Sequence, residues 1–78
     1  MNKLTLIEYN AGRGVYQYVP ENEGEPGEIV FDLFTGNVTV EKRAQNDTRG
    51  KYGHNATRRI LEYVGKKNLP IDAIQAWY

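Results

Sequence analysis

The densest group of chemically versatile side chains lies between Thr48 and Lys67, where six lysines and arginines accompany the only histidine and two tyrosines. Cationic side chains bind phosphate oxygens, and a tyrosine ring stacks on an unpaired base, so this composition is typical of contact with a nucleic acid. The free N–H groups at the start of a helix in this segment would add affinity for phosphate. The residues that would make the contact are Lys42, Arg43, Arg49, Lys51, Tyr52, Arg58 and Arg59.

The same segment also has the pattern of an ordinary solvated helix. Its apolar residues fall on one side of a helical wheel: Ala56, Ile60, Leu61, Tyr63 and Val64. Arg58, Glu62 and Lys66 alternate in charge at four-residue intervals, and such pairs stabilise an exposed helix by about 0.3–0.5 kcal/mol each without implying a function. Asn55 is the expected N-cap, and Pro70 forbids continuation of the helix. Both interpretations of the segment agree with the sequence.

Side chains for covalent catalysis are missing. The chain has no serine and no cysteine, so no Ser-His-Asp or Cys-His arrangement can form. One histidine without any cysteine also excludes the usual zinc sites. Glu8, Asp32 and Glu41 could share one face of a sheet, but an open face lacks the cleft that catalytic carboxylates need. We therefore expect a protein that is not an enzyme and that uses neither a cofactor nor a metal.

Size and composition predict one small globular domain spanning residues 1–78, because 40% of the residues are hydrophobic and 26% are charged. The absence of cysteine means that no disulfide stabilises the chain. No run of about twenty apolar residues is present, as a membrane span would require. We expect a cytoplasmic protein that has no membrane partner.

The formal net charge is zero, but the charges are unevenly distributed. Residues 1–34 contain two basic and six acidic residues, whereas residues 35–78 contain eight basic and four acidic residues. Such asymmetry fits either a basic binding face or two parts of one domain that attract each other or a second copy.

Two pairs of alternating segments predict two β-hairpins. Residues 3–9 and 15–19 alternate with a period of two around a turn rich in asparagine and glycine. The segment 28–43 does the same around Thr35 and Gly36, where the glycine supplies the positive φ of a tight turn. The pairs expected across this turn are Leu33 with Val38 and Phe31 with Val40.

The alternation divides the strand side chains between two faces. The face expected to form the core carries Leu4, Leu6, Val15, Val19, Ile29, Phe31, Leu33, Val38 and Val40. The opposite, uncovered face carries polar residues and three tyrosines, Tyr9, Tyr16 and Tyr18. Exposed tyrosines are enriched at protein interfaces, so we expect these three to bind a partner.

The combined pattern predicts an α+β fold: a four-stranded antiparallel sheet made of two β-hairpins, with one C-terminal helix packed on one face in two layers. Residues 71–78 leave a choice open. Ile71, Ile74 and Trp77 have helical spacing, so this segment fits either a short second helix or an extended tail that closes the core.

Two functions fit this architecture. The first is a non-enzymatic interaction module that binds a protein partner, or itself as a homo-oligomer, through the tyrosine-bearing face or an unpaired edge strand. The alternative is a nucleic-acid-binding accessory protein that uses the basic loop and the helix start. The two hypotheses require different surfaces, so the arrangement of the sheet and helix discriminates between them.

Overall fold

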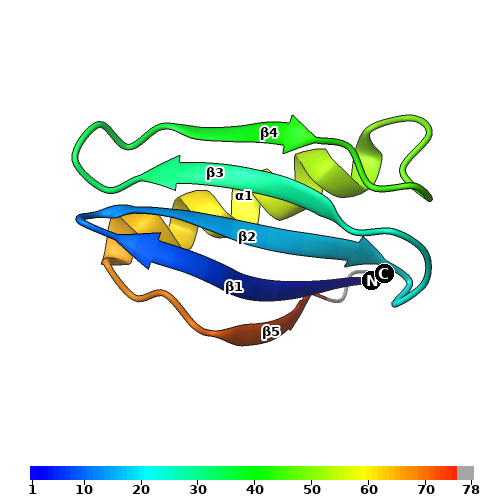
Figure 1. The fold of residues 1–78 in the computed structure, drawn as a ribbon, viewed down its shortest axis with the longest axis horizontal. Helices are drawn as coiled ribbons and strands as arrows, with labels where there is room; N and C mark the ends of the chain where they lie inside the picture. The colour runs from blue at the N-terminus through cyan, green and yellow to red at the C-terminus, as the bar shows by residue number, and fades with distance from the viewer. Residues whose placement is uncertain (76–78) are drawn as a thin grey trace.

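One antiparallel sheet and one helix make up the described part of the chain, residues 1–75 of a computed structural model (Figure 1). The elements in chain order are β1 (Asn2–Asn10), β2 (Arg13–Pro20), β3 (Gly27–Asp32), β4 (Val38–Lys42), α1 (Lys51–Lys66) and β5 (Asp72–Gln75). The strand order across the sheet is β4-β3-β2-β1-β5. The connection from β4 to β5, which contains α1, therefore crosses one face of the sheet from one edge to the other (Figure 1).

The fifth strand corrects part of the predicted fold. The α+β class and the antiparallel sheet with a helix on one face are confirmed, but the four-strand count is wrong because β5 pairs with the outer edge of β1. Two carbonyls fix this segment: Pro70 accepts from the Tyr16 hydroxyl at 2.6 Å, and Ile71 accepts from a β1 backbone N–H at 2.7 Å. Residues 72–75 are thus extended, whereas Trp77 lies outside the described residues.

The turn between β3 and β4 is longer than expected, and the predicted register is wrong. The observed pairs are Ile29 with Val40 and Phe31 with Val38. Asp32 causes the difference, because its carboxylate accepts from the backbone N–H groups of Phe34 and Thr35 at 2.8 and 3.3 Å. The same carboxylate accepts from Arg13 Nε at 3.1 Å. An acidic side chain therefore organises this turn, in place of a two-residue loop.

The two central tyrosines of β2 lie on the opposite face from the one predicted. Tyr16 and Tyr18 are 0% exposed, and they face α1. A buried phenol needs a partner for its hydroxyl. Tyr16 donates to the carbonyl of Pro70 at 2.6 Å, and Tyr18 donates to the carboxylate of Asp47 at 2.8 Å. The prediction that Tyr16 and Tyr18 form an exposed binding surface is therefore wrong.

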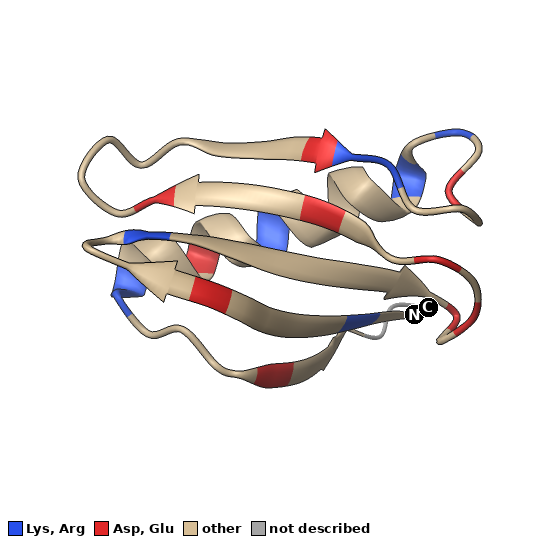
Figure 2. Ribbon diagram, in the orientation of Figure 1, with Lys and Arg blue, Asp and Glu red and all other residues tan. Residues whose placement is uncertain are grey.

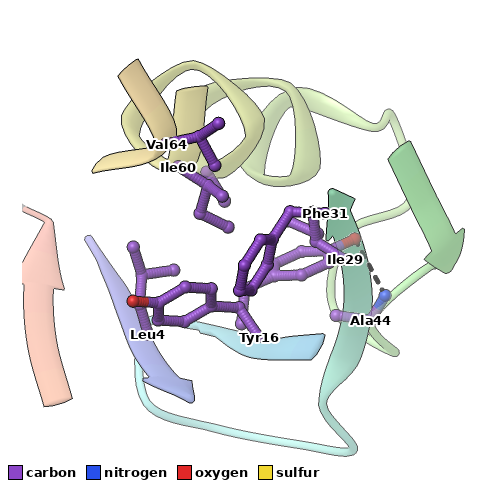
Figure 3. Close-up of a cluster of buried hydrophobic side chains, with 9 residues drawn as sticks. Leu4, Tyr16, Ile29, Phe31, Ala44, Ile60 and Val64 are labelled. Atoms are coloured by element: carbon purple, nitrogen blue, oxygen red, sulfur yellow. Dashed lines mark hydrogen bonds between the residues drawn. The ribbon is translucent and has the colours of Figure 1, made fainter. Parts of the chain in front are cut away.

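The core lies between the sheet and α1 (Figure 3). Its buried residues are Leu4, Tyr16, Tyr18, Ile29, Phe31, Ala44, Ala56, Ile60 and Val64. Figure 3 shows Ile60 and Val64 pointing from the helix toward the sheet, where the rings of Tyr16 and Phe31 have centroids 5.6 Å apart.

The predicted core residues divide into three groups. Those confirmed as buried are Leu4, Ile29 and Phe31. Those that pack against the core at its rim are Leu6, Leu33 and Val38. Those outside it are Val15, Val19 and Val40, because the two β2 valines face away from α1 and Val40 is 38% exposed.

A buried carboxylate connects the sheet to the start of α1. Asp47 is 1% exposed and accepts from the backbone N–H groups of Tyr52 and Gly53 at 3.0 and 2.8 Å. It also accepts from the hydroxyl of Tyr18, which in turn accepts from the N–H of Ala44 at 3.0 Å. One side chain thereby satisfies two donors of the first helical turn and one buried phenol.

The helix starts one turn earlier than predicted. Gly50 occupies the N-cap with φ 75°, and the predicted N-cap, Asn55, lies inside the helix. At the other end, Lys67 takes a left-handed conformation with φ 53°, and its N–H donates to the Val64 carbonyl at 3.2 Å. Within residues 1–75 no helix is long and apolar enough to cross a membrane.

Alanine should have opposite effects at Gly53 and Gly65, which lie in the same helix. A Cβ on Gly53 would lie 2.9 Å from Tyr18 Oη and 3.0 Å from Asp47 Oδ2, whereas a Cβ on Gly65 would meet no atom within 4 Å. We expect Gly53→Ala to lower the free energy of unfolding by about 1–3 kcal/mol through overpacking. Gly65→Ala should raise it by about 0.5–1 kcal/mol through helix propensity. Urea unfolding followed by circular dichroism measures both, and a stabilising Gly53→Ala would contradict the packing around Asp47.

Alkaline pH should unfold the protein cooperatively. Burial raises the pKa of Tyr16 and the pKa of Tyr18 from 10.0 to about 12. Because the unfolded chain loses these protons at lower pH, the stability from the neutral phenols is complete below pH 10 and lost as the pH rises toward 12. Circular dichroism and the phenolate absorbance of the buried pair should report one shared transition. Tyr9→Phe, which changes an exposed tyrosine, should leave its midpoint unchanged, and ionisation of the buried pair without unfolding would contradict the prediction.

Candidate functional site

The residues predicted to bind nucleic acid lie along the connection from β4 to α1 and on the helix itself (Figure 2). Those around the connection are exposed: Lys42, Arg43, Arg49 and Lys51. Arg58 and Arg59 lie further along α1, where Arg59 Nε approaches Glu62 at 3.8 Å. The structure therefore brings four of the cations to one end of the sheet and places two others along the helix.

The acidic loop between β2 and β3 lies at the same end of the molecule (Figure 2). Backbone and side-chain hydrogen bonds tie it to the loop before α1. Gln45 N–H donates to the Glu25 carbonyl at 3.0 Å, and Asn46 Nδ2 donates to the Glu23 carbonyl at 2.9 Å. The opposite charges of the two halves of the sequence therefore lie beside each other, and this end presents a mixed surface with acidic and basic sides.

Two supports of the nucleic-acid hypothesis are absent from the described fold. Phosphate was expected to meet the N–H groups of a helix that starts after Asn55, but α1 starts at Lys51, and the N–H groups of Tyr52 and Gly53 in its first turn donate to Asp47. The hydroxyl of Tyr52 donates to Glu21 Oε1 at 3.1 Å, and this hydrogen bond is the main cause of its raised pKa. Binding by the remaining cations stays a prediction.

Asp32, one of the carboxylates considered for acid–base chemistry, organises a turn. The backbone N–H of Phe34 is the largest cause that holds the pKa of Asp32 below its usual value, and Arg13 acts in the same direction. A general acid needs the opposite shift, since it must keep its proton near neutral pH. In the part of the chain that the structure describes, no group of three or more His, Asp or Glu side chains could hold a metal ion.

Tyr9 is the predicted partner-binding tyrosine that remains accessible, with 50% of its surface exposed. The register of β1 shifts between Leu6 and Glu8, so Tyr9 pairs with Gly14 and lies on the helix side of the sheet. Its ring stacks on Phe31 with centroids 6.2 Å apart. Tyr9 therefore forms part of the core rim and has one open side.

β4 is an edge strand with free backbone groups. The N–H of Asp32 donates to the carbonyl of Asn37 at 2.9 Å, and hydrogen-bonded pairs alternate along an antiparallel ladder. The next hydrogen-bonded pair contains Thr39, so the N–H and C=O of Val38 and the N–H of Val40 point away from β3. No strand among residues 1–75 pairs with that side of β4.

Apolar side chains border this free edge. Val38 and Val40 project to the helix side of the sheet, where Val38 is half-buried at the rim of the core and Val40 is 38% exposed. α1 runs obliquely from the end of β4 toward the β1–β2 turn (Figure 1). Leu61 is 44% exposed on the flank of α1 nearer β4. Arg59 and Gln75 of β5 line the same depression, so Arg59 marks the flank of α1 that faces β5. Leu61 follows two residues later, which is a rotation of roughly 200° about the helix axis, and it therefore lies on the opposite flank. We call Val38, Val40 and Leu61 the β4 strip.

The opposite edge, at β5, is fastened by buried amides. Asn2 is 0% exposed, and its Nδ2 donates to the carbonyl of Tyr52 at 3.0 Å and to Gln75 Oε1 at 3.1 Å. Gln75 Nε2 donates to the carbonyl of Asn55 at 2.8 Å. These bonds join β1 and β5 to α1, so the inner side of this edge is a structural joint.

The sequence interpretation placed the β4 strip in the core. Alternation identifies the face that Val38 and Val40 share, and helical spacing puts Leu61 on the apolar side of α1. Neither pattern shows how completely the helix covers each residue, and Val40 and Leu61 are 38% and 44% exposed. One feature of the sequence could have indicated that Leu61 is exposed: it lies at the margin of the apolar stripe, next to Glu62.

Comparison with known proteins adds no relative from which a function could be transferred. The chain matches no protein-family model, no curated protein and no solved structure. The features of this chain that indicate a function are therefore its surfaces, chiefly the free edge of β4, the β4 strip and the nearby cations.

Proposed function

We propose that this protein is a small interaction module that binds an extended segment of a protein partner along the free edge of β4. The observation that carries the proposal is the outward direction of the backbone groups of Val38 and Val40 beside the β4 strip, in which Val40 and Leu61 are exposed. In strand addition, backbone hydrogen bonds give affinity and side-chain pockets give selectivity. Tyr16 and Tyr18 have no part in this site because they are buried.

The bound segment would alternate between two environments. Its side chains on the helix side would lie over Val40 and Leu61, where apolar groups are favoured, and those on the other side would lie beside Thr39 and face solvent. Backbone hydrogen bonds to the three outward groups would each contribute about 1 kcal/mol. With modest apolar burial, a short peptide should bind with a Kd of roughly 0.1–1 mM.

Two features confine the pairing to the beginning of β4. The ladder with β3 shifts register between Glu28 and Ile29, which marks a β-bulge in β4. The charged residues Glu41, Lys42 and Arg43 follow. Bulges and charged residues at a sheet edge oppose open-ended pairing between copies. The edge is therefore suited to one short segment, and a partner chain is favoured over a second copy of this chain.

The test is an amide NMR titration of isotopically labelled protein with a short, end-blocked peptide of alternating valine and threonine. We expect saturable shifts at Val38, Thr39, Val40 and Leu61, because these residues line the added strand. Leu61→Lys places a charge beside the apolar side chains of the peptide, and it should weaken binding about tenfold, which corresponds to about 1.4 kcal/mol. Ile74→Lys is the matched control, since Ile74 is 68% exposed on the opposite edge, and it should leave the affinity unchanged.

Other occupants give different results in the same experiments. Equal affinity of the wild type and Leu61→Lys, or shifts confined to β5, would overturn the proposal. Sedimentation of the protein alone tests whether a second copy of the chain binds at β4: dimerisation that Leu61→Lys abolishes would replace the partner by self-association.

A mixed RNA and DNA pool tests the alternative function. Salt-sensitive shifts at Arg49 and Lys51, lost in the double substitution of both by glutamate, would favour nucleic-acid binding.

A further inference from the structure

The free edge of β4 leads into a group of exposed cations. Lys42 ends the strand and Arg43 follows it. The guanidinium of Arg43 folds over the loop before α1, where Nη1 donates to the carbonyl of Thr48 at 3.3 Å. Arg49 and Lys51 line a depression of about 120 Å³ in the same loop region. A chain that extends along β4 beyond the β4 strip therefore meets positive charge.

The acidic groups nearby do not neutralise this edge. Asp47 lines the same depression, but it is 1% exposed and accepts hydrogen bonds from one phenol and two backbone N–H groups. The glutamates of the β2–β3 loop lie on the side of the molecule toward β2, away from the free edge of β4 (Figure 2). Two further carboxylates lie at this edge: Glu41 precedes Lys42 in β4, and Glu28 of β3 pairs with Lys42 across the ladder. They face four exposed cations, Lys42, Arg43, Arg49 and Lys51, so the net charge at the end of this edge is positive.

We infer that the segment bound at β4 carries acidic residues on the part that passes Lys42 and Arg43. This inference rests on the proposed function and specifies its partner chemically: alternating apolar residues joined to a short run of carboxylates. All neighbouring strands of this sheet are antiparallel. An antiparallel addition places the carboxylates before the apolar residues in the sequence of the partner.

The expected effect is moderate because the cations are exposed. Pairs between solvated charges contribute a few tenths of a kcal/mol to about 1 kcal/mol each. Such pairs act on selectivity and on the association rate more than on affinity. Two carboxylates should therefore strengthen binding about 3- to 10-fold over a neutral segment at low salt. At about 1 M salt, where the screening length falls to about 3 Å, the difference should disappear.

The test compares three peptides that share the alternating valine and threonine segment and differ in the two residues before it. These residues are glutamates, glutamines or lysines, and binding is followed by the amide shifts of Val38 and Val40. We expect the glutamate peptide to bind most tightly and the lysine peptide most weakly. In Lys42→Glu the order should reverse or flatten, whereas Lys66→Glu, an exposed lysine at the far end of α1, should preserve it.

The outcomes separate the two claims. Equal affinities of all three peptides at Val38 and Val40 would overturn the acidic preference and leave the proposed function intact. Tightest binding of the lysine peptide would do the same. No shift at these residues with any of the three peptides would overturn the proposed function itself, and the inference with it.

Discussion

The carboxylate of Asp47 is the interaction on which the arrangement of sheet, loop and helix depends. A buried carboxylate is tolerated only when hydrogen-bond donors surround it. Here the phenol of Tyr18 and the backbone N–H groups of Tyr52 and Gly53 meet that requirement. Without this group, the first turn of α1 would lack a cap and a buried phenol would lack its acceptor. Asp47 therefore fixes two features at once: the face of the sheet on which Tyr18 is buried, and the residue at which the helix starts.

The position of that starting point determines what the helix leaves uncovered. The helix begins beside the end of β4 and must deliver the chain to β5 at the other edge. Sixteen residues of helix span about 24 Å, and five strands span about 19 Å between the outermost axes. The helix crosses the strands obliquely and ends near the β1–β2 turn (Figure 1), and residues 67–71 complete the connection to β5. Val40 and Leu61 stay exposed beside this path.

Local sequence patterns were sufficient where the interacting residues are close in the chain, as in the β1–β2 hairpin and the apolar stripe of α1. They could not identify the buried face of β2, because its valines and its tyrosines are both compatible with burial. The deciding acceptors of Tyr16 and Tyr18 lie 54 and 29 residues away. The candidate site was partly predictable: alternation placed Val38 and Val40 on one face, but it could not show that Val38 packs at the core rim while Val40 stays exposed. β5 was missed because four residues carry too little pattern.

The amide pair between Asn2 and Gln75 imposes an order of assembly on the chain. It joins residues 73 positions apart, whereas the β1–β4 meander is complete in sequence at Lys42. During synthesis the outer edge of β1 therefore stays unpaired until both α1 and β5 have been made. Gln75 also contacts the carbonyl of Asn55 in the helix, so β5 completes its bonding only on a docked α1. The side-chain hydrogen bonds of the last strand are thus complete only when the helical layer is in place, which couples the full bonding of the first-made edge to the two-layer fold.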